Sequence, residues 1–153
     1  MEQRQELIDK ALAARSQAYA PYSGFRVGAA LLSGSGRIYS GANIENASYG
    51  LTICAERTAF AAAISAGDTS FTILAVASPG GAAPCGACRQ VAAEFCRDLP
   101  VLLIDTERPA ELVEWRLCEL LPARFDLPLP ASDQHAGHAG GHEAGQRPTE
   151  HRA

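Results

Sequence analysis

Two short segments place cysteine and glutamate where they could hold and use a metal ion. One is Cys54-Ala55-Glu56, and the other, residues 84–88, reads Pro-Cys-Gly-Ala-Cys. Cysteines three apart in the first turn of a helix project from the same face and can reach one ion. The N-terminus of a helix also stabilises thiolates before any metal arrives. By itself a Cys-x-x-Cys pair could equally be a redox pair, so a zinc site requires further ligands.

Cys54 supplies a third thiolate, because it also stands where a helix is expected to begin. Three protein ligands with an open fourth position are the arrangement of catalytic zinc, whereas structural zinc is closed by four. All four histidines lie in residues 135–153, so the rest of the chain has no imidazole to close the site. Cys96 and Cys118 do not stand at a spacing from the other cysteines that is typical of zinc ligands, and we expect both in the core. The sequence therefore predicts an all-thiolate zinc site made by Cys54, Cys85 and Cys88.

Glu56 is the candidate acid and base of this site. Residues two apart on a helix point to nearly opposite sides, so Cys54 and Glu56 can serve one site only if Cys54 lies at the very start of its helix. A carboxylate in the first turn also complements the helix dipole, which is a purely structural alternative. Beside three thiolates we favour a base that acts on a zinc-activated water. The lack of histidine in the body excludes a protease triad and an H-E-x-x-H metal site.

Length and composition are typical of a single soluble globular domain. The chain has 153 residues, of which 47% are hydrophobic and 20% charged. Thirteen Lys and Arg against seventeen Asp and Glu give a net charge of −4, which argues against a general nucleic-acid or acidic-membrane binder. No signal peptide or membrane span is visible, and five cysteines in such a chain fit a reducing compartment. We therefore expect a cytoplasmic protein without nucleic-acid or membrane partners.

Helical and strand patterns alternate along the chain, which predicts an α/β sandwich. The expected helices cover residues 3–19, 54–66 and about 84–97, the last with Pro84 at its first position. The expected strands cover residues 25–32, 37–40, 71–77, 101–105 and 111–117, and a helix remains an alternative for the last. We expect residues 1–130 to form the domain and residues 131–153, rich in Gly and His, to be a disordered tail.

The two cysteine segments together resemble the signature of zinc-dependent nucleobase deaminases, in a form with three cysteine ligands. The likeness continues, in order along the chain, through residues 20–30, 43–50, 88–91 and 119–125. It covers roughly residues 5–127, and the chain is similar to the small homotetrameric cytidine deaminases. The resemblance implies a three-layer α/β/α sandwich with a mixed five-stranded sheet, and one zinc ion per subunit.

The resemblance also implies a reaction, the hydrolytic deamination of cytidine and 2′-deoxycytidine to uridine and 2′-deoxyuridine in pyrimidine salvage. A zinc-activated water attacks C4 of the base, Glu56 shuttles the protons, and ammonia is released. Arg57 matches a residue that hydrogen-bonds the thiolates. Because three thiolates and Zn²⁺ sum to a charge of −1, this guanidinium would help to keep the water acidic.

Four further positions match the family's contacts to the nucleoside. Asn43 and Glu45 correspond to a clamp on the ribose hydroxyl, Phe25 to an aromatic ring beside the pyrimidine, and the Ala55 N–H to a donor for the base carbonyl. From residue types alone, Asn43 and Glu45 could equally be turn residues of a polar loop. Phe25 could equally be a core residue of a strand.

Two aromatic residues match positions that complete the pocket of a neighbouring subunit. These are Tyr49 and Phe125, and they imply a homotetramer. One position departs from the family: Ala83 stands where serine is frequent, so a hydrogen bond near the site is missing. Two alternatives remain open. A deaminase of aminonucleoside antibiotics is less consistent with Asn43 and Glu45, and a non-catalytic zinc module would need a fourth protein ligand.

Overall fold

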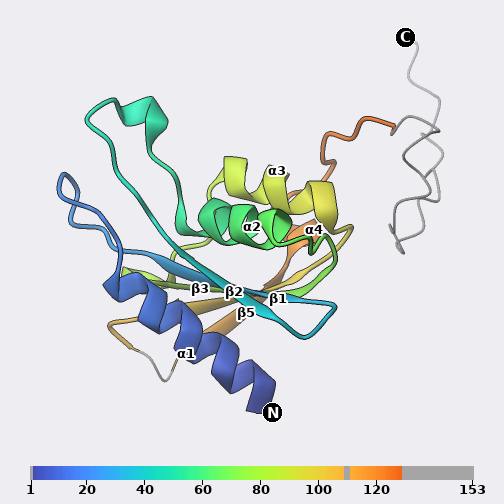
Figure 1. The fold of residues 1–153 in the computed structure, drawn as a ribbon, viewed down its shortest axis with the longest axis horizontal. Coiled ribbons are helices and arrows are strands. Elements are labelled where there is room, and N and C mark those ends of the chain that lie inside the picture. The colour runs from blue at the N-terminus through green and yellow to red at the C-terminus, as the bar shows by residue number, and fades with distance from the viewer. Residues whose placement is uncertain (1, 109–110, 129–153) are drawn as a thin grey trace, which may run out of the picture.

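A central sheet lies between helices on both of its faces (Figure 1). The computed structural model describes residues 2–108 and 111–128. The predicted tail, residues 131–153, lies outside the described residues, as does the predicted domain boundary at residue 130. The predicted three-layer α/β/α sandwich is confirmed.

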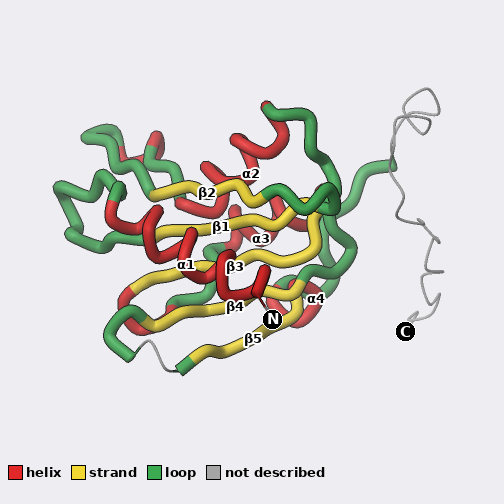
Figure 2. The backbone as a smooth tube through the Cα atoms, turned by 60° about the horizontal axis from the view of Figure 1, so that its bottom comes forward, coloured by secondary structure: helices red, strands yellow, loops and turns green. Residues whose placement is uncertain are grey.

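The sheet has five strands in the order β2-β1-β3-β4-β5, which lie side by side in Figure 2. Only β3 and β4 run parallel, and the other neighbouring pairs are antiparallel. The sheet is therefore mixed, as the resemblance implied. The strands are β1 (Gly28–Ser33), β2 (Ile38–Ala42), β3 (Phe71–Ser78), β4 (Pro100–Asp105) and β5 (Leu112–Arg116). The strand predicted near residues 111–117 is thus confirmed, and its helical alternative is wrong.

The helices are divided between the two faces. On one face lies α1 (Glu2–Ser16), and on the other lie α2 (Ala55–Ser65) and α3 (Gly86–Phe95), with the short α4 (Leu117–Leu120) beside them (Figure 1). Two separate apolar cores result. Leu7 and Ala11 of α1 pack over one face, while Phe60 of α2 and Ala92 of α3 pack over the other. A strand with helices on both faces must be apolar on both, which is why β1, Gly-Ala-Ala-Leu-Leu-Ser, is buried along its whole length.

The third helix begins later than the sequence predicted. Pro84 is not its first residue, since Cys85 is an extended N-cap and α3 starts at Gly86. The helix also ends at Phe95 rather than near residue 97. The extended Cys85 backbone, at φ −66° and ψ 166°, turns the chain from the preceding loop into the helix. Cys85 is therefore the N-cap of α3, and Cys88 lies in its first turn.

Two glycines let helix backbones approach the sheet closely. A Cβ atom on Gly28 would lie 2.1 Å from the Ala11 carbonyl oxygen of α1. A Cβ atom on Gly41 would lie 2.4 Å from the Ala59 backbone nitrogen of α2. No side chain fits into these gaps, so glycine sets the distance between the layers on both faces.

Gly28→Ala should therefore destabilise the protein strongly, because the new methyl group forces α1 away from the sheet. We expect a loss of roughly 1–3 kcal/mol or more, measured as the free energy of unfolding in urea. Gly50→Ala is the control, since a Cβ at Gly50 meets nothing within 4 Å. Equal stability of the two variants would contradict the proposed close approach.

Candidate metal centre and its pocket

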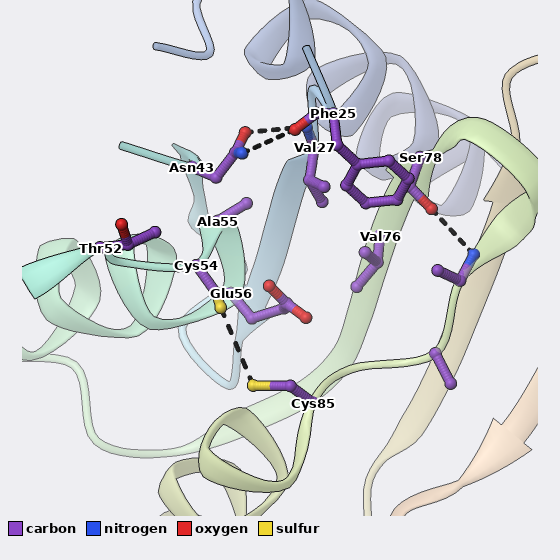
Figure 3. A pocket seen from close by; sticks show the side chains of 12 residues that line it. Phe25, Val27, Asn43, Thr52, Cys54, Ala55, Glu56, Val76, Ser78 and Cys85 are labelled. Carbon is purple, nitrogen blue, oxygen red and sulfur yellow. Dashed lines mark hydrogen bonds between the residues drawn. The ribbon is translucent and has the colours of Figure 1, made fainter. Parts of the chain in front are cut away.

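Two helix N-termini bring three cysteine sulfurs together. Cys54 is the N-cap of α2 and Cys85 the N-cap of α3, while Cys88 lies in the first turn of α3. The Sγ atoms of Cys54 and Cys85 are 3.8 Å apart, and those of Cys85 and Cys88 are 3.5 Å apart (Figure 3). Neither N-cap sulfur bonds to the backbone of its own helix, so both remain available to a ligand.

The spacing of the sulfurs fits a tetrahedral zinc ion. With Zn–S bonds of about 2.3 Å, two ligands of such an ion are about 3.8 Å apart. All three sulfurs lie within 4.8 Å of one another, and in residues 2–108 and 111–128 no other His, Cys, Asp or Glu forms a group of this kind. Three donors leave a fourth position open, which suits catalytic rather than structural zinc. The predicted ligand set Cys54, Cys85 and Cys88 is thus brought together.

Electrostatics favour the thiolate form at Cys54. A hydrogen bond with Cys88 and the Arg57 guanidinium lower the pKa of the Cys54 thiol. Arg57 Nη2 lies 3.7 Å from Cys54 Sγ and 3.3 Å from the Thr52 carbonyl oxygen. In the described part of the chain, Arg57 Nε is the buried side-chain donor that has no partner. A guanidinium with a free buried donor beside three sulfurs suits a cluster that carries negative charge.

Glu56 lies beside the sulfurs and is 5% exposed. Its carboxylate points into the cavity between Cys54, Cys85 and Val76 (Figure 3). Cys54 lies at the very start of its helix, as the sequence analysis required. Because it is the extended N-cap of α2, its side chain need not point in the direction that a residue inside the helix would take. Burial raises the pKa of the Glu56 carboxyl, and the negative charge of Cys54 raises it further. A carboxyl with a raised pKa holds a proton more readily than an ordinary carboxylate, which suits a group that must accept a proton and return it.

A cavity of about 170 Å³ opens over Glu56 and the sulfurs. Of the predicted residues, it is lined by Phe25, Asn43, Cys54, Ala55, Glu56 and Cys85. Phe25 is 42% exposed, so the alternative of a core strand residue is wrong. Sequence reasoning missed five other lining residues, and no motif in the sequence marks them as a set: Val27, Thr52, Val76, Ser78 and Ala82. Ala83, noted for its departure from the family, also lines the cavity.

Asn43 and Glu45 use their side chains to hold the chain next to the pocket. Asn43 Oδ1 accepts the Val27 N–H at 2.8 Å, and its Nδ2 donates to the Phe25 carbonyl at 2.8 Å (Figure 3). Glu45 accepts hydrogen bonds from the backbone N–H groups of Tyr22 and Ser23 and from the Ser23 hydroxyl. Asn43 lines the cavity, whereas Glu45 is not among its lining residues. Both residues therefore have a structural task in addition to the predicted contact with ribose.

Tyr49 and Phe125 lie outside the cavity of their own chain. Tyr49 is 90% exposed in a 3₁₀ turn, Tyr49–Leu51, and Phe125 is 68% exposed. Neither is among the residues that line the cavity. The described chain therefore does not bring these two residues into its own cavity.

The two remaining cysteines differ from each other. Cys96 is buried, as predicted, and burial raises the pKa of its thiol to about 11. The prediction of a core position for Cys118 is wrong, because its side chain is exposed. Leu117 begins α4 and is buried, and the next helical residue is turned by about 100°, which directs Cys118 to solvent. No described helix is both long and apolar enough to cross a membrane.

Comparison with known proteins gives consistent results. The family described as the cytidine and deoxycytidylate deaminase zinc-binding region matches residues 1–103. A cytidine deaminase of Sporosarcina psychrophila is 52% identical over 124 residues, which are 79% of this chain and 90% of that protein. One from Halalkalibacterium halodurans is 50% identical over 125 residues, covering 80% and 93%. The crystal structure of a cytidine deaminase from Burkholderia pseudomallei superposes with a TM-score of 0.75 at 46% identity, covering 79% and 98%.

Cys85→Ser should abolish zinc binding without unfolding α3. Serine is a good N-cap, so the helix start is preserved while one of three ligands is lost. We expect the zinc content per chain, measured by mass spectrometry after dialysis, to fall to near zero while the helical circular dichroism is unchanged. Cys118→Ser removes an exposed cysteine outside the cluster and should keep its zinc. A Cys85→Ser protein with full zinc content would refute this ligand assignment.

Proposed function

The chain belongs to the cytidine and deoxycytidylate deaminase zinc-binding family, and from this premise we propose how its own residues perform the reaction. It is a zinc-dependent enzyme that hydrolyses cytidine to uridine and ammonia. We extend the substrates to 2′-deoxycytidine. The observation that carries the proposal is a buried carboxylate, Glu56, beside three converging sulfurs at an open cavity.

Cys54, Cys85 and Cys88 would hold the zinc, which supplies the Lewis acidity that makes a water molecule acidic and nucleophilic near neutral pH. Glu56 accepts the proton of that water and delivers it to N3 of the pyrimidine. The water oxygen forms a bond to C4, and Glu56 then accepts the second proton from that oxygen and delivers it to the amino group. The C4–N bond then breaks and ammonia leaves, so that cytidine and water give uridine and ammonia.

Arg57 is proposed to balance the charge of the centre. Three thiolates and a divalent cation sum to −1, and the adjacent guanidinium brings the total to zero. Its contact with Cys54 and its unpartnered buried Nε support this role. A less electron-rich centre keeps the water acidic, which is the property that Glu56 exploits.

The nucleoside is proposed to bind between Phe25 and the start of α2. Ala55 is the first residue of α2, so its N–H has no partner within the helix and can donate to the base carbonyl. Phe25 offers a ring face to the pyrimidine. Asn43 and Glu45 accept hydrogen bonds from the ribose hydroxyls, through oxygen lone pairs that their hydrogen bonds within the chain do not use. For this last contact the support is the position of Asn43 on the cavity wall.

We further propose a homotetramer in which Tyr49 and Phe125 complete the pocket of a neighbouring subunit. Their exposure, together with that of Leu51 and Leu127, supports burial against another copy. We also propose that residues 1–130 are the catalytic domain and that the enzyme acts in pyrimidine salvage in the cytoplasm. Free cysteines as zinc ligands are consistent with a reducing compartment.

Glu56→Gln should bind zinc normally and lose activity by a factor on the order of 10³ or more, because the amide cannot carry protons. The measurement is the loss of cytidine absorbance, with zinc quantified in the same sample. Glu94→Gln, an exposed carboxylate of α3, is the matched control and should keep wild-type turnover. Near-normal activity of Glu56→Gln would show that another group moves the protons. A zinc-loaded wild type that turns over no pyrimidine nucleoside would refute the proposed function itself.

The shared pocket can be tested by mixing two impaired variants. Glu56→Gln subunits keep Phe125, and Phe125→Ala subunits keep Glu56, so a mixed oligomer contains some sites with both residues intact. We expect co-expressed subunits to be more active than the sum of the two separate variants. Activity equal to that sum, or a monomer in analytical ultracentrifugation, would contradict the proposed assembly.

A further inference from the structure

Two buried polar side chains at the ends of adjacent strands have no role in the chemistry described above. Ser78 ends β3 and Asp105 ends β4, and they are register partners in the parallel pair. They are 1% and 5% exposed. Ligands of open α/β sheets bind beyond the carboxyl ends of parallel strands, and Ser78 indeed lines the cavity.

Both side chains hold the loop that follows β3, residues 79–83. Asp105 Oδ1 accepts the Gly80 N–H at 2.9 Å. Ser78 Oγ accepts the Ala82 N–H at 2.8 Å, a bond that Figure 3 marks with a dashed line from Ser78. Ala82 and Ala83 of the same loop line the cavity. The loop is therefore a wall of the pocket, tied to the sheet by two side chains.

The loop depends on these bonds because its own backbone is permissive. Gly80 and Gly81 have φ angles of 70° and 61°. Glycine adopts positive and negative φ angles about equally readily, so these two residues do not fix the loop conformation by themselves. Asp105 is well suited to hold such a loop, because it is itself fixed. It also accepts the Glu107 N–H at 2.9 Å and pairs with Arg108 Nε at 3.1 Å, and the Glu107 bond lowers the pKa of its carboxyl.

The metal-binding end of the loop is anchored separately. Arg89 Nε donates to the Pro84 carbonyl at 2.6 Å, and its Nη1 donates to the Leu120 carbonyl at 2.8 Å. Cys85 itself begins α3. Loss of the Asp105 bond should therefore loosen the loop at Gly80 without displacing the sulfurs, while the Ser78 bond to Ala82 remains.

We propose that Asp105 is a positioning residue for the substrate: through Gly80 it fixes the pocket wall formed by Ala82 and Ala83. The inference rests on the proposed function, because the occupant of the pocket is taken to be a pyrimidine nucleoside. The wall determines how tightly the nucleoside binds, whereas Glu56 and the three cysteines determine the rate of the chemical step.

The test compares variants of Asp105, the last residue of β4, with a variant of Asp98, which lies just before the strand. Asp105→Ala should raise the KM for cytidine on the order of tenfold, with kcat and zinc content within about twofold of wild type. Asp105→Asn retains an acceptor for Gly80 and should restore most of the affinity. Asp98→Ala is the matched control, since Asp98 precedes β4, pairs with Arg116 and accepts the Cys118 N–H, away from the cavity. It should lower the melting temperature but leave KM unchanged.

Amide hydrogen exchange of residues 80–83 gives a readout that does not require turnover. Exchange should be faster in Asp105→Ala than in wild type or Asp98→Ala. An unchanged KM or unchanged exchange in Asp105→Ala would overturn the proposal, as would an equal rise of KM in Asp98→Ala. If wild-type protein fails to deaminate cytidine, the proposed function fails, and the exchange data still decide whether Asp105 holds the loop.

Discussion

The meeting of two helix N-termini is the constraint on which the rest of the structure depends. Cys54 and Cys85 are the N-caps of α2 and α3, so the sulfurs converge only if both helices start at the same end of the sheet. The parallel pair β3 and β4 makes this possible, because the chain leaves β3 at that end and enters α3 after a short loop. Gly41 then lets α2 lie close enough to the sheet for its first turn to face the cavity.

Charge explains why the centre needs its neighbours. Three thiolates at one point repel each other, and the N-termini of two helices, Arg57 and a divalent cation all offset that repulsion. Glu56 lies among these groups but is buried, and this burial raises the pKa of its carboxyl. If the cluster were absent, burial of this carboxylate among apolar groups would only destabilise the folded state.

The pocket above the centre is made largely by residues whose first task is structural. Asn43 holds the backbone at Phe25 and Val27, and Asp105 holds the loop at Gly80. Such residues fix the cavity walls to the sheet, so that the geometry of the nucleoside site follows from the packing of the sandwich. Substitutions at these positions are expected to affect affinity before they affect the chemical step.

Residue types and spacing were sufficient to predict the cysteine cluster and the order of helices and strands, because each depends on local periodicity or on a short motif. The three-layer class followed from the resemblance to a known family. The sequence patterns failed where a shift of one or two residues in a helix changes the direction of a side chain. Pro84 precedes the N-cap instead of beginning α3, and Cys118 faces solvent instead of the core. Only the tertiary structure brought Thr52, Ser78 and Ala82 to one cavity and joined Asp105 to Gly80. The physical reason is that these contacts link segments far apart in the chain, and their partners are set by strand register and helix packing, which no local pattern encodes.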